Sequence, residues 1–331
     1  MLNADEIGGR MLELSSREYY VRGRGYVERI GDVESVAVKP AGPSGAPVLE
    51  VGYEELPAVL AQMKHVEDDY GIPIPLDAEG AEYMVMLSSM EIMNFPEYLA
   101  AVAKIMQQAG KTWTLCSTAF EATNAGIQIG NSDLAKVIVS RIVDGAEKLK
   151  VKTVISPECG HAYTALRWEG ANLIGRPFSF EVKHIVEVLG EFQEQGLLKT
   201  EGFETDKLTF HDPCQLVRRG GVIQQPRKLM NMVAKNFVEM PDAGFANWCC
   251  GGGGGASAIE EGEELRLEAF RKKKSQLEAV KPDRLVTACA NCRIVLEEGL
   301  EHYQMDIPVV GLTEMIAEHI PEQSPHAAAK S

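Results

Sequence analysis

Five of the seven cysteines in this 331-residue chain fall into one pattern. Cys214 is followed after 34 residues by the adjacent pair Cys249–Cys250, and after a further 38 residues by Cys289-x-x-Cys292. Thiolates are soft ligands that select iron–sulfur clusters or zinc. A disulfide between adjacent cysteines would be strained, so two ligands to one cluster explain the pair better. The pattern predicts a metal centre bound by Cys214, Cys249, Cys250, Cys289 and Cys292.

Structural zinc is the main alternative for these cysteines, because tetrahedral sites with four cysteines are common. Zinc would leave one of the five unused and the adjacent pair unexplained, so an iron–sulfur cluster is favoured. The odd cysteine count argues against a disulfide framework. The first residues, MLNADEIGGR, contain no apolar signal segment. We therefore expect a reducing, cytoplasmic location.

A run of five glycines, Gly251 to Gly255, directly follows the cysteine pair. Glycine allows close approach of the backbone to a bulky inorganic core, and its N–H groups can donate hydrogen bonds to sulfur. We expect Gly251, Gly252 and Gly253 to contact the cofactor. The run does not follow a strand in the G-x-G-x-x-G arrangement, so it is not a dinucleotide fingerprint.

Short apolar runs alternate with helical periods from about residue 81 onward, which predicts an α/β fold with parallel sheets. The expected strands are 83–87, 112–116, 153–156, 207–211, 284–288 and 307–310. The expected helices are 96–109, 132–149, 182–195, 224–235, 257–279 and 312–319, with a further short helix at about 53–66.

The two halves of this region resemble copies of one unit. Ser156-x-x-Cys159 aligns with Cys289-x-x-Cys292, and Cys116 occupies roughly the place of the Cys249–Cys250 pair. The sequence thus predicts two Rossmann-like parallel-sheet units, of which only the second keeps five cysteines. The expected organisation is an N-terminal appendage (1–80), a degenerate unit (81–200), a cluster-binding unit (201–320) and a tail (321–331).

Charge and hydropathy limit the classes of partner. The chain has 33 basic and 48 acidic residues, a formal charge of −15, whereas nucleic-acid binding favours a basic face. No nucleic-acid partner is therefore expected. No apolar run reaches the eighteen or so residues that span a bilayer. A membrane-bound partner complex stays open.

The segments HDPCQLVRR, WCCGGGGG and TACANC resemble the CCG cysteine-rich domain found in DsrK and in the B-type polypeptide of heterodisulfide reductases. Related domains occur in some lactate and glycerol-3-phosphate oxidising systems. The segment SPECGHAYTALRWEGANLIGRP (156–177) is most similar to the DsrK-like branch. The resemblance implies a non-cubane 4Fe-4S cluster on the five cysteines, at which a disulfide is cleaved. Cys116 and Cys159 match only remnants of a second ligand set, so one cluster is expected.

The resemblance implies an oxidoreductase subunit, heterodisulfide reductase-like, that performs thiol–disulfide chemistry linked to sulfur oxidation or sulfite reduction. The sequence contains no ferredoxin cysteine signature, so a ferredoxin-type subunit, and a flavoprotein subunit with it, are the expected partners. The substrate is a small or protein-borne thiol or disulfide. The alternatives are an electron-transfer subunit of an organic-acid dehydrogenase and a zinc-stabilised scaffold.

Other polar residues have two interpretations each. His161 can give a proton to a leaving thiolate, or simply pack at a helix start. His211 and Asp212 are expected to shape the loop into the cluster. Arg218 and Arg219 either attract an anionic substrate or are solvated. The run Arg271–Lys274 is typical of a solvated helix end.

Overall fold

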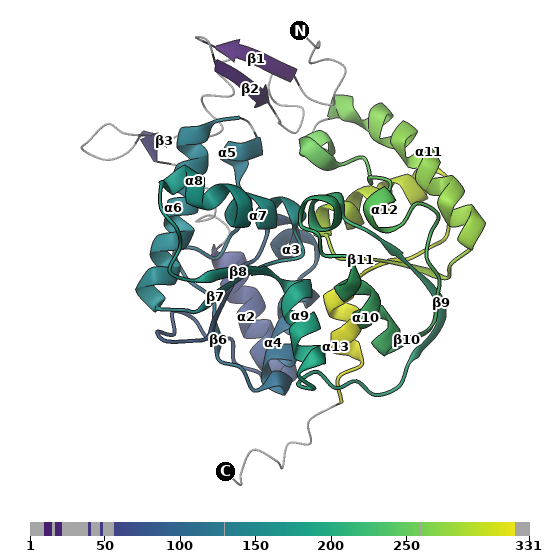
Figure 1. The fold of residues 1–331 in the computed structure, drawn as a ribbon, viewed down its shortest axis with the longest axis horizontal. Coiled ribbons are helices and arrows are strands. Elements are labelled where there is room, and N and C mark those ends of the chain that lie inside the picture. Colours follow the sequence, from purple (N-terminus) through teal and green to yellow (C-terminus); the bar gives the residue numbers. More distant parts are fainter. Residues whose placement is uncertain are drawn as a thin grey trace.

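The chain is an α/β protein with two four-stranded parallel sheets, which confirms the predicted fold class (Figure 1). Two short antiparallel strand pairs precede them. They are β1 (Arg10–Leu14) with β2 (Arg17–Val21) and β3 (Lys39–Pro40) with β4 (Pro47–Val48). The computed structural model describes residues 10–14, 17–21, 39–40, 47–48, 56–128, 130–258 and 260–321. Most of the predicted appendage and nearly all of the predicted tail lie outside these residues.

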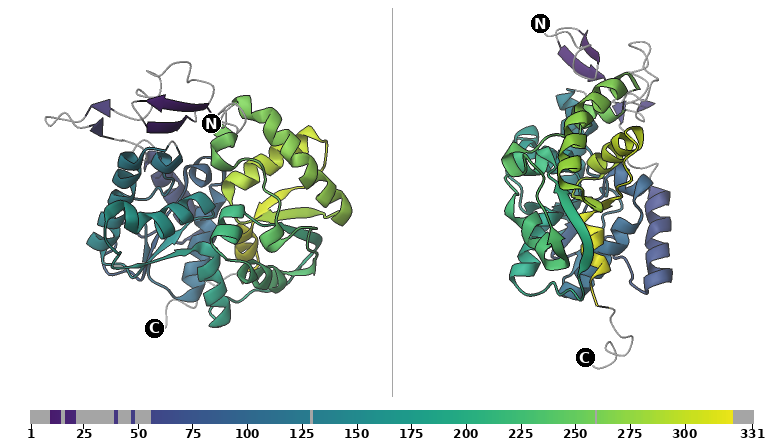
Figure 2. Two further views of the ribbon diagram at one scale, coloured as in Figure 1. Left: turned by 45° about the horizontal axis from the view of Figure 1, so that its top comes forward. Right: turned by 90° about the vertical axis from the view of Figure 1, so that its right-hand side faces the viewer.

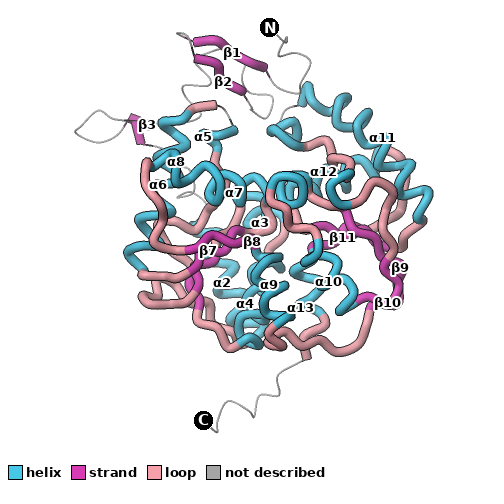
Figure 3. Tube along the Cα trace, in the orientation of Figure 1, coloured by secondary structure: helices cyan, strands magenta, loops and turns pink. Residues whose placement is uncertain are grey.

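The two sheets, whose strands are magenta in Figure 3, have the same strand order. The first is β6-β5-β7-β8 and the second is β10-β9-β11-β12, with every pairing parallel. The first strand of each unit therefore lies between the second and third, as expected for copies of one unit. The first sheet comprises β5 (Tyr83–Val85), β6 (Trp113–Thr114), β7 (Thr153–Ser156) and β8 (Glu181–His184). The second comprises β9 (Glu204–His211), β10 (Ala234–Phe237), β11 (Arg284–Thr287) and β12 (Val309–Gly311).

Helices follow the strands in both units. In and before the first unit they are α2 (Leu56–Tyr70), α3 (Ser89–Asn94), α4 (Glu97–Ala109), α5 (Ala125–Gln128), α6 (Ser132–Leu149), α7 (Gly160–Thr164), the π-helix η2 (Ala165–Glu169), α8 (Gly170–Ile174) and α9 (Ile185–Glu194). In the second unit they are the π-helix η3 (Gln215–Arg219), α10 (Gln224–Val233), the 3-10 helices η4 (Gly244–Ala246), η5 (Gly253–Ala258) and η6 (Glu260–Gly262), α11 (Glu263–Val280), α12 (Ala290–His302) and α13 (Leu312–Glu318).

The two units lie side by side, blue to teal and green to yellow in Figure 2. Their contacts occur in matching pairs. Helix α4 packs on α13 while α10 packs on α9, and α3 packs on α12 while η3 packs on α7. Each partner follows the corresponding strand of its own unit, so the halves are related by an approximate two-fold axis. Each half therefore supports the strand-to-helix turns of the other.

Two strands differ from the sequence prediction. Residues Glu181–His184 form β8 and Ala234–Phe237 form β10, where helices were expected to run over 182–195 and 224–235. Both strands are edge strands of four residues, too short for period-two alternation to compete with the helical pattern that adjoins them. None of the helices in the described part of the chain combines the length and apolarity that crossing a bilayer requires.

Candidate metal centre

The five predicted cysteines come from three segments that meet at the carboxyl end of the second sheet. Cys214 precedes η3, just after β9, and Cys289 caps the start of α12, just after β11. Cys292 lies in the first turn of α12, and Cys249–Cys250 follow η4. Parallel strands place their carboxyl ends at one edge of a sheet, so these segments converge. None of the five is in a disulfide, and Cys250, Cys289 and Cys292 are buried.

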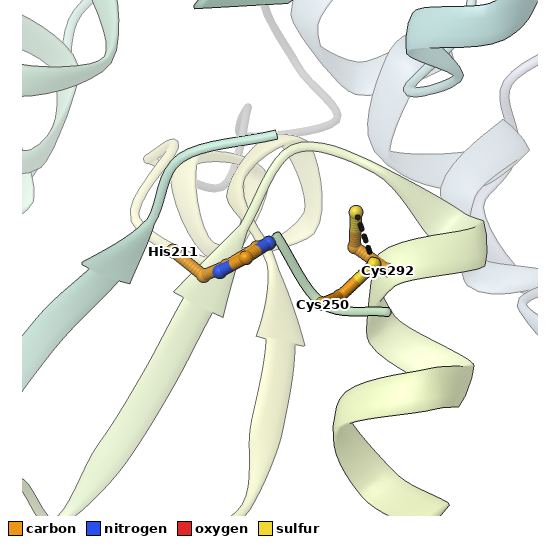
Figure 4. A group of neighbouring side chains, drawn as sticks. All are labelled: His211, Cys250 and Cys292. Carbon is orange, nitrogen blue, oxygen red and sulfur yellow. Dashed lines mark hydrogen bonds between the residues drawn. The ribbon is translucent and has the colours of Figure 1, made fainter. Parts of the chain in front are cut away.

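The thiols are close enough to share protons. The Sγ atoms of Cys250 and Cys292 are 3.4 Å apart (Figure 4). Hydrogen bonds donated by the thiols of Cys214 and Cys250 lower the pKa of Cys249. A hydrogen bond from the Cys292 thiol lowers the pKa of Cys289 to about 7. Cys249 and Cys289 are therefore favoured as thiolates, the form that binds metals, whereas the thiol–thiol hydrogen bonds and burial raise the pKa of Cys214, Cys250 and Cys292.

Backbone N–H groups add to this stabilisation. Gly251 N–H donates to the Cys249 Sγ at 3.4 Å. The backbone N–H groups of Cys292, Gly160 and Asn291 also lower the pKa of Cys289, although none of those in α12 makes a side-chain cap hydrogen bond to its sulfur. Free N–H groups at a helix start favour negative charge. The first unit thus contributes directly to the surroundings of a predicted ligand.

Two glycines of the run are required by geometry. Gly251 has φ +100°, and a Cβ there would also lie 3.3 Å from the Arg266 carbonyl oxygen. A Cβ on Gly252 would lie 2.5 Å from Val295 Cγ2. A Cβ on Gly253 would meet the Cys249 Sγ at 3.9 Å, an ordinary contact. The tight turn keeps the segment against α11 and α12. Contact between these glycines and a cofactor stays a prediction.

His211 was expected only to shape the loop before Cys214, but its side chain lies directly beside the cysteines. It is the last residue of β9, its side chain is fully buried, and neither ring nitrogen has a hydrogen-bond partner among the described residues. A ring nitrogen of His211 and the Sγ atoms of Cys250 and Cys292 all lie within 4.8 Å of one another. Burial lowers the pKa of His211 well below the usual value, so the ring is neutral.

Lys273 corrects the interpretation of Arg271–Lys274 as a solvated helix end. Its side chain is buried, and its Nζ donates to Gln276 Oε1 at 2.7 Å. Burial lowers its pKa to about 8, against the opposing effect of the nearby acidic groups Cys250, Asp212, Cys292 and Cys249. A cation beside several thiolates offsets their negative charge. A lysine within a basic run gives no sequence signal of burial, because only the packing of α11 hides it.

Asp212 joins the two loops that carry Cys214 and the cysteine pair, in keeping with the loop-shaping role expected from the sequence. Its buried carboxylate accepts hydrogen bonds from the Arg227 guanidinium, one of them at 2.6 Å, and from Gly244 N–H at 2.7 Å. Asn247 Nδ2 donates to the Asp212 carbonyl oxygen at 2.5 Å. These contacts fix the segment two residues before Cys249.

His161 and Arg219 line one cavity of about 300 Å³ between the units. His161 Nε2 lies 3.0 Å from the Asn124 carbonyl oxygen. Arg219 is more than half exposed and lies 3.6 Å from Glu169. Gln215, which directly follows Cys214, lines the same cavity. The arrangement brings together a titratable group and a cation beside the helix that begins at a predicted ligand.

The remaining two cysteines are buried and free. Cys116 Sγ lies 3.4 Å from Thr118 Oγ1. Cys159 caps α7, and its Sγ accepts Ala162 N–H at 3.5 Å. Because Cys289 occupies the N-cap position of α12, Cys159 corresponds to Cys289. The alignment of Cys159 with Cys292 was therefore wrong by about one helical turn, since helix start rather than cysteine spacing sets the correspondence.

The donor set suits a thiolate-bound metal centre. Five cysteine sulfurs converge, two of them on half-buried residues, and Lys273 supplies a nearby cation. The two ring nitrogens of buried His211, which find no partner among the described residues, are costly unless a further group lies beside them. Soft thiolates select iron–sulfur clusters or zinc over hard cations. The residues present fit an iron–sulfur cluster.

Comparison with known proteins supports this description. The cysteine-rich domain family CCG matches residues 208–297, which contain all five cysteines. The EtfAB:quinone oxidoreductase of Syntrophomonas wolfei is 27% identical over 237 residues, covering 68% of this chain and 32% of that protein. The D-type polypeptide of dihydromethanophenazine:CoB–CoM heterodisulfide reductase from Methanosarcina mazei is 27% identical over 227 residues, covering 66% and 54%.

A third relative is the Hdr-like menaquinol oxidoreductase iron–sulfur subunit 2 of Archaeoglobus fulgidus. It is 26% identical over 306 residues, covering 78% of this chain and 55% of that protein. The chain spans about a third to a half of the length of these relatives. Residues 208–297 are therefore a CCG cysteine-rich domain, and the chain is homologous to the D-type polypeptide of heterodisulfide reductase and to Hdr-like iron–sulfur subunits.

Proposed function

We propose that this chain is an iron–sulfur redox subunit that carries out thiol–disulfide chemistry at one non-cubane 4Fe-4S cluster. The observation that carries the proposal is the convergence of five thiols from three segments, two of them 3.4 Å apart. The ligands are Cys214, Cys249, Cys250, Cys289 and Cys292. Five thiolates exceed the four that a closed zinc site uses.

The cluster supplies single electrons and an iron to which a substrate sulfur can bind. The chain's own residues stabilise the charge of the ligands. Gly251 N–H and the start of α12 hold negative charge on the thiolates of Cys249 and Cys289. The buried side chain of Lys273 offsets that negative charge.

The cavity lined by His161 and Arg219 is the proposed entry for the thiol or disulfide. Arg219 is exposed enough to attract an anionic group, although it already lies 3.6 Å from the Glu169 carboxylate. His161 stands on the cavity wall, where an imidazole can give a proton to a departing thiolate. Gln215 connects this cavity to Cys214 along η3.

Electron supply requires partners in this proposal. Two relatives are named as subunits of oxidoreductases, and each is about twice as long as the region it shares with this chain. We infer a ferredoxin-type iron–sulfur subunit, and a flavoprotein subunit with it. The acidic charge of −15 suits docking of a partner that presents a basic face.

Anaerobic purification followed by iron, sulfide and zinc analysis tests the cofactor. About four irons and four sulfides per chain are expected, together with brown absorbance. Cys249→Ala and Cys250→Ala should each lose that absorbance, whereas Cys116→Ser should keep it. Stoichiometric zinc without iron would refute the proposal.

A second candidate is an electron-transfer subunit with no substrate at the cluster. The relatives named as quinone and menaquinol oxidoreductases favour it, because those names describe no sulfur substrate. EPR spectra recorded with and without a thiol or disulfide separate the two. A spectrum that shifts with substrate, and no longer shifts in Arg219→Leu, supports thiol–disulfide chemistry. An unchanged spectrum supports the electron-transfer role.

A further inference from the structure

His211 is a buried polar side chain whose ring nitrogens have no hydrogen-bond partner in the part of the chain that the structure describes. The imidazole is fully buried at the end of β9, and both ring nitrogens have no hydrogen-bond partner among the residues that the structure describes. Its backbone is fixed, because Thr287 Oγ1 donates to the His211 carbonyl oxygen at 3.2 Å. His211 pairs with Thr287 in the register of β9 with β11, so the backbone that carries the ring is part of the sheet. Such a group is expected to have a partner that the polypeptide does not supply.

The cysteine sulfurs are the groups that the ring faces. Figure 4 shows one ring nitrogen directed toward Cys250 and Cys292, and the three ligand atoms lie within 4.8 Å of one another. Cys250 follows η4 and Cys292 lies on α12, so two separate segments bring sulfur to the imidazole. An imidazole ring carries at least one N–H donor whether it is neutral or protonated. Sulfur is an acceptor, so the N–H has a suitable partner here.

We propose that His211 is a positioning residue of the metal centre, donating an N–H hydrogen bond to a sulfur atom of the cluster. The inference rests on the iron–sulfur function proposed above. Direct ligation is the less suitable arrangement. An iron that bound the thiolates of Cys250 and Cys292 together with the imidazole would have one position left of four, too few for the bridging sulfides of a cluster.

A hydrogen bond to cluster sulfur stabilises the reduced state, which carries more negative charge, and so raises the reduction potential. His211→Leu removes the donor and keeps an apolar side chain in a dry position. The variant should be about tenfold harder to reduce at a given potential, which for a one-electron couple is a fall of about 59 mV. His211→Gln retains an amide N–H and should recover part of the shift.

The test compares wild type, His211→Leu and His211→Gln, all purified anaerobically. His319→Leu is the control, because it removes a part-buried imidazole of the same unit whose Nδ1 lies 2.9 Å from the Met315 carbonyl oxygen instead. Iron and sulfide are measured first, and EPR-monitored redox titration follows. The expected result is similar iron content in all four, a lower potential in His211→Leu, a partial shift in His211→Gln and none in His319→Leu.

Labelling histidine with ¹⁵N adds a spectroscopic signal that would not change if His211 had only a structural role. Electron spin-echo spectra of the reduced cluster should show a weak nitrogen coupling that His211→Leu loses. An unmoved potential with full iron content overturns the inference alone. A strong coupling typical of a bound nitrogen also overturns it, in favour of ligation. Zinc in place of iron overturns the proposed function and this inference with it. If His211→Leu does not fold, the shift in His211→Gln decides.

Discussion

Replacement of Asp212 is expected to disconnect the two loops that carry Cys214 and the cysteine pair. The carboxylate is 1% exposed and binds the Arg227 guanidinium, whose side chain is 13% exposed. It also accepts Gly244 N–H at 2.7 Å. Asp212→Ala therefore removes one partner of a buried ion pair and leaves a backbone donor unpaired. The variant should lose both stability and bound iron.

The loss of stability in Asp212→Ala depends on the buried charge of Arg227 that the substitution leaves without its partner. Removing one partner of a buried pair costs about 3–5 kcal/mol, because the other charge stays buried. Arg227 keeps a second partner, Glu239, at 2.8 Å, but that side chain is 42% exposed. We therefore expect the lower end, about 3 kcal/mol. At roughly 2–4 °C for each kcal/mol in a domain of this size, the melting temperature should fall by about 6–12 °C.

Thermal melts and iron analysis of anaerobic protein measure this. Glu239→Ala is the matched control, since it removes the exposed partner of the same arginine and should cost at most about 1 kcal/mol. The double variant Asp212→Ala/Arg227→Met should recover part of the lost stability, because no buried charge is then left unpaired. A change of about 1 °C in melting temperature corresponds to less than about 1 kcal/mol of stability. If Asp212→Ala melts within about 1 °C of wild type and binds full iron, contacts other than those of Asp212 hold the two loops.

Three further outcomes are expected. Lys273→Met should lower the reduction potential of the cluster, because it removes a buried cation beside the thiolates; redox titration that shows no fall would contradict this. Cys116→Ser and Cys159→Ser should leave iron content near wild type, since two thiols cannot hold a four-iron core; loss of most iron in either would revive a second cluster. Gly299→Ala should destabilise by about 1–3 kcal/mol, because its Cβ would lie 2.2 Å from the Phe270 ring; an unshifted melting temperature would show that the ring moves aside freely.

The sequence was sufficient for the fold class because its signals are local. The strands Thr153–Ser156 and Arg284–Thr287 each centre on two buried β-branched or aliphatic residues, Val154–Ile155 and Leu285–Val286, so strand and repeat could both be predicted. The missed strands Glu181–His184 and Ala234–Phe237 exist because a neighbouring strand pairs with them at the sheet edge. Tertiary pairing decides such segments, and local propensity does not report it.

The residues of the site likewise fall into those that could be predicted from the local sequence and those that could not. Cys289-x-x-Cys292 directly follows the strand expected at 284–288, so its place at the carboxyl end of the sheet could be predicted from the sequence. Lys273 and Gly160 could not be assigned, because each reaches the cysteines through packing between segments that are distant in sequence. His211 precedes Cys214 by three residues, yet no sequence pattern reveals that its ring nitrogens are left without partners in the described structure.

The degenerate state of the first unit has a physical explanation in its own contacts. Where the second unit has Cys214 at the end of its first strand, the first unit has Ser88, whose hydroxyl and Glu91 cap α3 reciprocally. Ser88 thus offers a hydroxyl in place of a thiolate, and that hydroxyl takes part in the helix cap. Cys159 likewise directs its sulfur at the Ala162 N–H. A single cluster is therefore consistent with the side-chain hydrogen bonds of the first unit.

The first unit nevertheless holds the second in place. The carbonyl oxygen of Glu158 accepts Ala290 N–H at 2.7 Å, and its buried carboxylate accepts the backbone N–H and hydroxyl of Thr313 at 2.8 and 2.6 Å. These bonds anchor the starts of α12 and α13. Gly160 N–H also lowers the pKa of Cys289, so a copy without the five-cysteine set still affects the charge of a predicted ligand in the other. The first half thus helps to hold the helix starts of the second half, including that of α12, which carries Cys289 and Cys292.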